Sequence, residues 1–472
     1  MLISRLPFFR SVSFFLAALL LPVCVSRAAA DAADSADAAP VAFAPRDLTE
    51  VSPRDGLPRF FQKLENGKAV RIGYLGGSIT AQKGWRVQSR AWLQKQFPKT
   101  QIEGINAAIG GTGSDLGVFR VQSDVLDQKP DLLFVEFAVN DANASPDRIR
   151  KAMEGIVRKT WRALPDCDIA FVYTITKSDI AVLKTGKMKR SESVMEDVAD
   201  HYGIPSIHLG METARLEAEG KLVMSSPDAR VERPSGDELD VSSDIPTDEQ
   251  GRILFSKDGV HPYLDTGHAL YTQAIIRSIP AIRAAGGKSP RASASAPALP
   301  APLVAANWEN ARMIPFGATP AAAGIRIDGP ATLLDPATDG RARSFAARLP
   351  SLWKLEPGAT LRFRFRGTRA AIYDLLGPDC GALRITIDGK STEQRLFDGY
   401  CTYHRLGTAV LGDGLPDTEH NVEVTVLAGR VDKKNVLFER NRADFEKSPA
   451  KYAGSNWYAG ALFLLGELVG PE

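Results

Sequence analysis

Apolar and polar positions follow one pattern in the first part of this chain and a different one in the last part. Before residue 288, short apolar runs alternate with segments whose apolar residues recur every three or four positions. The strand-like runs are Val70–Leu75, Ile102–Ile109, Leu132–Ala138, Ile169–Ile175 and Ser206–Leu209. The helical segments are Trp85–Phe97, Leu116–Leu126, Ile149–Leu164, Val194–His201 and Gly267–Ile282. Because continuous apolar runs suit strands that are covered on both faces, the alternation predicts an α/β domain over 50–287, with a parallel five-stranded sheet flanked by helices.

The pattern changes after residues 288–303, whose Pro, Ala and Ser content is typical of a linker. Beyond it, Leu361–Arg366 alternates apolar and basic residues, and Gly and Pro turns separate the strand candidates. Helical periodicity is scarce there. Residues 304–472 are therefore predicted to form a C-terminal antiparallel β-sandwich, jelly-roll-like in type.

The N-terminus has the features of an export signal. Arg5 and Arg10 precede the apolar run Val12–Val25, and Ala28-Ala29-Ala30 follows it. This pattern predicts a cleaved signal peptide over 1–30 and a secreted or periplasmic protein. The apolar run is shorter than the roughly 20 residues that a membrane span needs, so no stable span is expected. Residues 31–49 are rich in Ala, Asp and Ser and are predicted to be a flexible leader.

Composition narrows the range of partners. Lys plus Arg (58) nearly balance Asp plus Glu (56), which gives no electrostatic reason to expect nucleic acid. The sequence lacks a full GxGxxG or phosphate-loop motif and any Cys/His cluster, so neither a nucleotide cofactor nor a metal is predicted.

Cys380 and Cys401 could pair in an oxidising compartment, whereas Cys167 is expected to be a small buried residue. Nothing in the sequence predicts an oligomeric state.

Polar residues follow several of the predicted strands. They are Gly77-Ser78 after the first strand, Gly110–Asp115 after the second, Val139–Asp141 after the third, and Asp258–Pro262 after the fifth strand and a long insertion. Since ligands of open parallel sheets bind beyond the carboxyl ends of the strands, these groups are expected to meet at one edge. A serine hydroxyl, a carboxylate and an imidazole in one place predict nucleophilic ester chemistry.

Four sequence blocks, GGSIT, INAAIGG, EFAVND and DGVHP, resemble the SGNH (GDSL-like) hydrolase family in residues and in order. The resemblance covers roughly residues 68–285 and implies a flavodoxin-like sheet and a serine esterase that needs no cofactor. It implies that Ser78 is the nucleophile and that Asp258 and His261 are its acid and base partners. The implied oxyanion hole consists of the N–H groups of Ser78 and Gly111 and the side-chain amide of Asn140. The chain departs from the family pattern at two positions, where Gly77 replaces a frequent Asp and Ala138 replaces a usual Gly.

The joining of such a domain to a β-sandwich is similar to bacterial carbohydrate esterases. An acylated carbohydrate is therefore the expected substrate, with removal of acetyl groups as the reaction. Two alternatives stay open: a lipid-ester or lysophospholipid hydrolase, and an inactive glycan-binding protein.

Some individual features also have two interpretations. His208 is a rival for the role of base because it follows the fifth strand, and the acidic segment 225–251 is either a solvated loop or a lid. In the C-terminal part, the basic side chains on one strand face are either solvated or bind anions. Three aromatic residues there either lie in the core or stack on sugar rings. These basic and aromatic residues are Arg362, Arg364, Arg366, Trp353, Trp457 and Tyr458.

Overall fold

A computed structural model describes residues 43–226, 246–292, 299–429 and 431–470 of the chain. The predicted signal peptide and most of the predicted leader lie outside these residues. The first part contains the predicted parallel sheet, with strand order β3-β2-β4-β5-β6. This order confirms the flavodoxin-like arrangement. The strands are β2 (Val70–Gly76), β3 (Ile102–Asn106), β4 (Leu132–Glu136), β5 (Asp168–Tyr173) and β6 (Ser206–His208).

One short strand was not expected. β1 (Val51–Ser52) pairs antiparallel with β6 and makes the sheet six-stranded. Two residues show no periodicity, so the sequence pattern carries no signal for such a strand.

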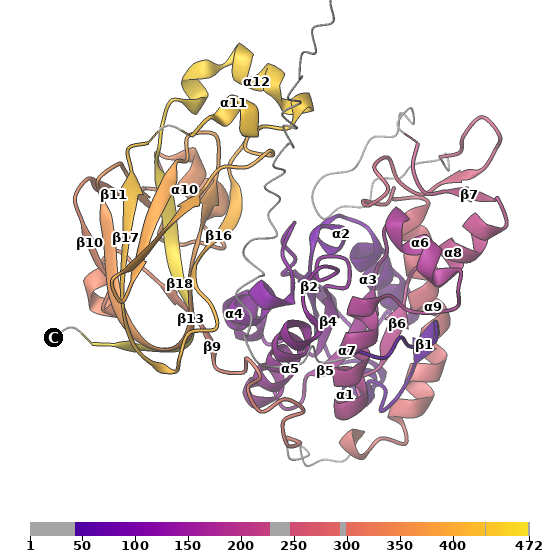
Figure 1. The fold of residues 1–472 in the computed structure, drawn as a ribbon. Helices are drawn as coiled ribbons and strands as arrows, with labels where there is room; N and C mark the ends of the chain where they lie inside the picture. Colours follow the sequence, from indigo (N-terminus) through magenta and orange to yellow (C-terminus); the bar gives the residue numbers. More distant parts are fainter. Residues whose placement is uncertain (1–42, 227–245, 293–298, 430, 471–472) are drawn as a thin grey trace, which may run out of the picture. The chain divides into compact units, whose positions relative to one another are not determined.

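Helices cover both faces of this sheet (Figure 1). One face packs against α1 (Pro58–Glu65), α3 (Trp85–Gln96) and α9 (Gly267–Gly286). The other face packs against α4 (Ser114–Asp124), α5 (Pro146–Ala163) and α7 (Arg190–Tyr202). The shorter elements are α2 (Ser78–Ala81), α6 (Ile180–Leu183), α8 (Met211–Ala218), β7 (Leu222–Val223) and β8 (Ile253–Leu254). The double cover explains why the sheet strands appear in the sequence as continuous apolar runs.

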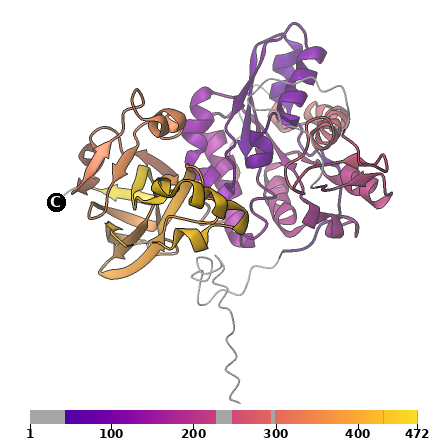
Figure 2. The same cartoon turned by 90° about the horizontal axis from the view of Figure 1, so that it is seen from above.

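The named strands of the C-terminal part pair antiparallel, as predicted (Figures 1 and 2). Its long strand β13 pairs with β17 along its first half and with β16 along its second half. β18 pairs with both halves, and the register shifts between Gly367 and Arg369. The strands are β9 (Ala311–Pro315), β10 (Arg326–Asp328), β11 (Ala331–Leu333), β12 (Trp353–Leu355), β13 (Thr360–Leu376), β14 (Ala382–Ile387), β15 (Lys390–Arg395), β16 (Arg405–Gly412), β17 (Thr418–Leu427) and β18 (Trp457–Val469).

Short α-helices accompany these strands. α10 (Gly340–Phe345) follows β11, and α11 (Lys433–Val436) and α12 (Arg442–Lys447) lie between β17 and β18.

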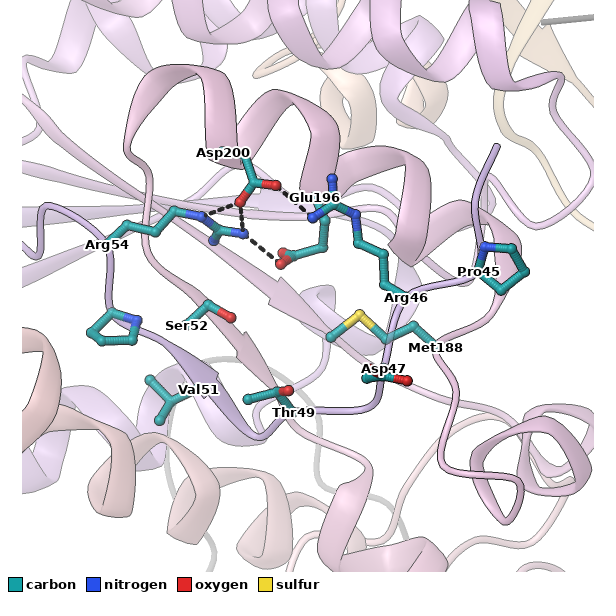
Figure 3. Close-up of a pocket in the computed structure, with 11 residues that line it drawn as sticks. Pro45, Arg46, Asp47, Thr49, Val51, Ser52, Arg54, Met188, Glu196 and Asp200 are labelled. Carbon is teal, nitrogen blue, oxygen red and sulfur yellow. Dashed lines mark hydrogen bonds and ion pairs between the residues drawn. The ribbon is translucent and has the colours of Figure 1, made fainter. Parts of the chain in front are cut away.

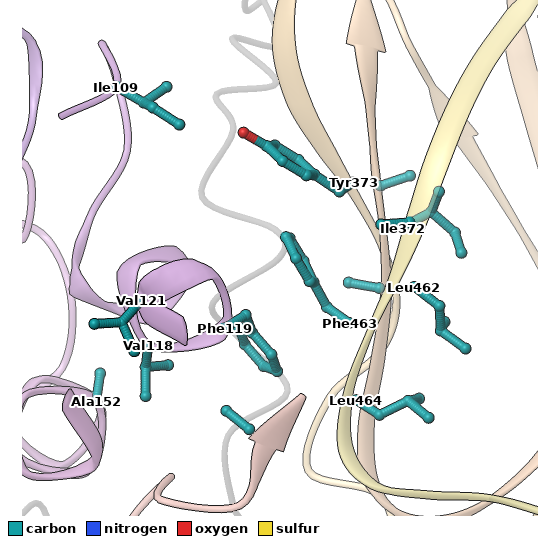
Figure 4. Close-up of a cluster of buried hydrophobic side chains, with 14 of the residues drawn as sticks. Ile109, Val118, Phe119, Val121, Ala152, Ile372, Tyr373, Leu462, Phe463 and Leu464 are labelled. Atoms are coloured by element: carbon teal, nitrogen blue, oxygen red, sulfur yellow. The ribbon is translucent and has the colours of Figure 1, made fainter. Parts of the chain in front are cut away.

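The α/β part and the β-sandwich share a hydrophobic cluster, part of which Figure 4 shows. Phe119 of α4 stacks on Phe463 of β18 with ring centroids 5.0 Å apart, and Phe463 stacks on Tyr373 of β13 at 5.0 Å. Arg148 of α5 adds a polar bridge, because it pairs with Asp413 beyond β16 at 2.8 Å. The sandwich thus packs directly on α4, the helix that follows the predicted oxyanion loop.

The ends of the predicted leader and linker contact the α/β part. Arg46 pairs with Asp197 at 2.8 Å. At the far side of the predicted linker, the backbone N–H groups of Leu303 and Val304 donate to the buried Glu154 carboxylate at 2.5 and 2.8 Å. Tertiary contacts therefore hold these residues in place, and the amino-acid composition of the leader and linker does not predict such contacts.

Two further observations concern the protein's environment. Among the described helices, none combines the length and the apolar character that crossing a membrane requires. Cys167, Cys380 and Cys401 are buried free thiols in this structure.

Candidate active site

The sheet topology places the predicted site residues around Ser78. β2 ends at Gly76 and lies between β3 and β4. The loop with Gly111 follows β3, and the loop with Asn140 follows β4. Ser78 is the first residue of α2, directly beyond β2. Three neighbouring strands therefore deliver the hydroxyl and the two other proposed oxyanion donors to one sheet edge.

His261 bridges Ser78 and Asp258. Its Nε2 lies 2.8 Å from Ser78 Oγ, and its Nδ1 lies 2.8 Å from Asp258 Oδ2. The other carboxylate oxygen, Asp258 Oδ1, accepts hydrogen bonds from the backbone N–H groups of Val260 at 3.0 Å and His261 at 2.8 Å. The acid thus holds both the ring and the backbone of the residue that contacts the serine.

The same contacts set the charge of Asp258. Partial burial acts to raise its pKa, but the hydrogen bonds from His261 and Val260 outweigh burial and hold the pKa well below its usual range. Asp258 is therefore ionised at neutral pH, the state in which it orients an imidazole and stabilises its protonated form.

Asn140 and the Gly110-Gly111 turn flank the serine. A Cβ placed on Gly77 would lie 1.9 Å from Asn140 Oδ1, so the amide of Asn140 lies directly against the Gly77 backbone. A Cβ on Gly110 would lie 3.5 Å from Ser78 Cβ. The absence of a side chain at Gly77 permits this close approach.

Lys177 and Ser256 support the loop that carries Asp258 and His261. The Lys177 N–H donates to the Gly259 carbonyl at 2.7 Å, and the Gly259 N–H donates to Ser256 Oγ at 2.8 Å. Ser256 Oγ in turn donates to the Met224 carbonyl at 2.8 Å. Sequence reasoning missed these two supporting residues, because neither belongs to a motif with a chemical meaning of its own.

Two buried acids near the site were also missed. Asp141 accepts a hydrogen bond from the Ser114 N–H at 3.0 Å and so links the loops that carry Asn140 and Gly111. Glu136 ends β4 and is 1% exposed. The sequence offered one signal for Glu136. It is a charged residue at the end of an apolar run, and charged residues are rarely buried unless they have a partner or a role.

The rival features have structural roles instead. His208 is buried, and its Nε2 lies 3.2 Å from Glu192 Oε2, while His261 contacts Ser78. Trp457 and Tyr458 are fully buried, so the core interpretation is confirmed for both. The predicted arginine face is paired with acids, for example Arg362 with Glu423 at 2.7 Å.

The other arginines of this face and the third aromatic residue also have partners within the sandwich. Arg364 and Arg366 both pair with Glu419, and Trp353 is half-buried with its indole N–H donating to Gly317 O at 3.0 Å. Most of the segment 225–251, residues 227–245, lies outside the described residues.

A hollow of about 600 Å³ lies elsewhere, beside β1 (Figure 3). Its lining includes Arg54, Glu196 and Asp200. Arg54 pairs with Glu196 at 2.5 Å and with Asp200 at 2.7 Å. These charged side chains are paired with one another, and none of the residues of the four motifs lines this hollow.

One group of side chains in the described residues has the spacing of a cation site. Donor atoms of Asp379, Cys380 and His404 lie within 4.8 Å of one another in the β-sandwich. The Asp379 carboxylate already accepts hydrogen bonds from Tyr458 at 2.5 Å and from Arg341 at 3.3 Å. A cation there would face the Arg341 guanidinium, so these residues do not suit a metal.

Comparisons with known proteins agree with this architecture. The model of the GDSL-like Lipase/Acylhydrolase family matches residues 74–262, a range that contains all four motifs. A solved two-domain esterase (CEX), described as active on acetylated mannans and co-crystallised with mannopentaose, is similar in fold. It is 18% identical with a TM-score of 0.64, and the alignment covers 89% of this chain and 98% of that one. A second structure of a two-domain esterase (CEX) active on acetylated mannans gives 18% identity and a TM-score of 0.63, over 88% of this chain and 99% of that one.

A curated relative matches a short segment only. The uncharacterized lipoprotein YqeF of Bacillus subtilis is 38% identical over 64 residues. The match spans 11% of this chain and 26% of that protein.

The family match and the order of the strands lead to one assignment. Residues 74–262 form a GDSL-like lipase/acylhydrolase (SGNH) domain, the family whose model matches them, and their sheet has the strand order expected from the sequence.

Proposed function

We propose that this protein is an exported serine esterase that removes acetyl groups from a polysaccharide or an oligosaccharide. The observation that carries the chemical part of the proposal is the position of His261, 2.8 Å from both Ser78 Oγ and Asp258 Oδ2. A base within hydrogen-bond reach of a hydroxyl, itself oriented by a carboxylate, is the arrangement that activates a serine.

In the proposed mechanism, Ser78 Oγ attacks the ester carbonyl while His261 Nε2 accepts the hydroxyl proton. The resulting oxyanion is stabilised by the N–H groups of Ser78 and Gly111 and by the Asn140 amide. His261 then donates its proton to the departing sugar oxygen, which leaves an acetyl group on Ser78. Water that loses a proton to His261 hydrolyses this acyl-enzyme and releases acetate.

The exposure of the site supports a bulky substrate. The side chains of His261 and Asp258 are 27% and 44% exposed in the part of the chain that the structure describes. Gly110 and Gly111 are exposed as well. A site near the surface lets a polymer chain approach sideways, whereas a long acyl chain needs a deep apolar pocket to shield it from water.

The likeness to the two-domain esterase supports a carbohydrate in particular. The shared arrangement extends over 98% of that chain and includes the β-sandwich, and that protein is described as active on acetylated mannans. We therefore propose an acetylated glycan as the substrate of this chain also. The apolar N-terminal segment with its Ala28-Ala29-Ala30 stretch supports export.

Acetate release from acetylated mannan, acetylated xylan and an aryl acetate tests the proposal. We expect wild type to release acetate, and Ser78→Ala to lose activity on the order of 10⁴-fold or more. Ser391→Ala, on the exposed strand β15, is the matched control and keeps full activity. Equal inactivity of wild type and Ser78→Ala would instead support the glycan-binding alternative. A preference for acyl chains of eight carbons or more would replace the carbohydrate substrate by a lipid ester.

A further inference from the structure

Glu136 is a buried carboxyl group beneath the candidate site. It is the last residue of β4, and its side chain contacts Thr80 of α2 and Thr174, the residue after β5. Oε2 accepts a hydrogen bond from Thr80 Oγ1 at 2.8 Å, and Oε1 accepts one from Thr174 Oγ1 at 2.7 Å. Glu136 takes part in no ion pair within the described ranges of the chain. A buried carboxyl group without a cationic partner costs stability, so its presence calls for a compensating role.

The first contact of Glu136 is with the turn that presents the nucleophile. Thr80 lies two residues after Ser78 and is fully buried. The backbone N–H of Gly77, the residue before Ser78, acts to lower the pKa of the same carboxyl group. The carboxyl group therefore contacts the turn that carries Ser78 through Thr80.

The second contact leads to the loop that carries the proposed acid and base. Thr174 directly follows β5, and three residues later the Lys177 N–H donates to the Gly259 carbonyl at 2.7 Å. Gly259 lies between Asp258 and His261. A short, continuous path of hydrogen bonds and backbone thus runs from Glu136 to the base-bearing loop.

The character of the carboxyl group suits this role. Burial raises the pKa of Glu136, while the hydrogen bonds from Thr174, Thr80 and the Gly77 N–H and the charge of Lys189 act in the opposite direction. Each of the two carboxyl oxygens is engaged by one threonine hydroxyl, so the group connects the two segments at once.

We propose that Glu136 is a positioning residue, which joins the Ser78 turn to the segment supporting the Asp258–His261 loop and so sets the distance between Ser78 and His261. The inference rests on the proposed function, since it assigns Glu136 a part in aligning that nucleophile and base. Glu136 does not contact the reacting atoms. It acts through Gly77, Thr80 and Thr174.

Substitution at Glu136 tests the proposal, with aryl acetate as substrate. Glu136→Met removes every accepted hydrogen bond at similar volume and is expected to lower kcat by roughly 100-fold, because small displacements of reacting groups have effects of that size. KM stays within about twofold, since no substrate contact is lost. Glu136→Gln keeps one accepting oxygen and is expected to recover part of the loss. The rate of Ser78 modification by an aryl fluorophosphonate falls in parallel with kcat.

The control is a second buried carboxyl group in the same domain. Glu154 is fully buried and accepts hydrogen bonds from Tyr202 Oη at 2.6 Å and the Val304 N–H at 2.8 Å. Glu154→Met and Glu154→Gln are expected to change thermal stability without changing kcat. If Glu136→Met does not fold, Thr174→Val breaks one of the two connections at almost constant shape and is expected to lower kcat with KM unchanged.

Three results would overturn the positioning role. They are an unchanged kcat in Glu136→Gln and Thr174→Val, an equal fall in kcat for the folded Glu154 variants, or a fall in kcat without slower fluorophosphonate modification. Activity of Ser78→Ala close to that of wild type would instead remove the proposed function itself. Loss of activity in Ser78→Ala together with normal Glu136 variants would remove the positioning role alone.

Discussion

At the scale of single residues, the position of Asn140 depends on the missing side chain of Gly77. An added Cβ would lie 1.9 Å from Asn140 Oδ1 and 2.8 Å from its Cγ. Gly77→Ala must therefore displace the Asn140 amide. Because loss of one oxyanion donor lowers kcat by about 100- to 1,000-fold, we expect Gly77→Ala to lower kcat at least tenfold with little change in KM. Steady-state kinetics with an aryl acetate measures both values.

Two further variants separate this effect from general strain. Gly340→Ala adds a methyl group where no other atom lies within 4 Å and is expected to leave kcat unchanged. In an Asn140→Ala background, Gly77→Ala is expected to have almost no additional effect, since both changes remove the same donor. Fully additive losses would show that Gly77 acts by some other route.

The same scale shows what a sequence reveals about a site. The groups that meet at Ser78 were predicted because each one directly follows a strand or belongs to a motif. Glu136 and Asp141 were not predicted as support, since their roles depend on burial and on partners at Thr174 and Ser114, far away in the chain. The sequence shows an acidic residue near a strand end, but only packing shows that it is enclosed.

At the scale of elements, α4 connects the oxyanion loop to the β-sandwich. Phe119 on α4 is 2% exposed and stacks on Phe463 at 5.0 Å. Phe119→Ala and Phe463→Ala are each expected to lower the free energy of unfolding by about 3–5 kcal/mol. The double variant should lose less than the sum, by about 0.5–1.5 kcal/mol, because the aromatic contact can be removed only once. Denaturant unfolding of the three variants measures these differences.

An exposed phenylalanine in the same protein is the control. Phe438 is 43% exposed, so Phe438→Ala is expected to change the free energy of unfolding by only about 0.5 kcal/mol. Strict additivity of the Phe119 and Phe463 effects would contradict direct coupling between α4 and β18.

The burial of a strand also determines whether its sequence shows the alternation of apolar and polar residues that identifies a strand. The alternation at Leu361–Arg366 was detected because one face of β13 there is buried and the other is not. The pattern disappears along residues 370–376, where every residue is buried. The length of β13 was therefore missed, although its first half was found. A strand covered on both faces loses the period of two that identifies it.

At the scale of the whole molecule, the sequence predicted two folded parts and left their relation open. The structure shows that their hydrophobic residues form a shared cluster. Phe119 and Phe463 illustrate why this was not foreseen. Each fits the apolar pattern of its own element, and nothing in the local sequence distinguishes a residue that packs within a domain from one that packs between domains.

Buried acids in both parts give the molecule a pH-dependent stability. Burial raises the pKa of Asp141 in the α/β part to about 7, and its neighbour Asp115 adds to the rise. Burial also raises the pKa of Asp374 in β13 to about 7 and that of Asp168 in β5 to about 6. Between pH 4 and pH 7 the folded state keeps protons that the unfolded chain has already released. The free energy of unfolding therefore falls as pH rises through this range.

Other acids act in the opposite direction at lower pH. At Asp379, hydrogen bonds from His404 and Tyr458 outweigh burial and lower the pKa to about 2, and at Asp339 a hydrogen bond from Arg341 does the same. Their contribution is present above pH 4 and is lost as pH falls toward 2. The two groups of acids together predict a maximum of stability in mildly acidic solution.

The midpoint of thermal unfolding between pH 4 and pH 8, followed by circular dichroism, checks this prediction. We expect Tm to be several degrees higher at pH 5 than at pH 8.

Asp374→Asn tests the part played by one of these acids. It keeps an oxygen for the Trp457 indole N–H, which donates to Asp374 Oδ2 at 2.9 Å, but it removes the ionisation. The fall in Tm with pH therefore becomes shallower. Asp417→Asn, at an exposed position, is the control and keeps the wild-type slope. A Tm that rises from pH 5 to pH 8, or a slope that Asp374→Asn leaves unchanged, would show that these buried carboxyl groups do not govern stability.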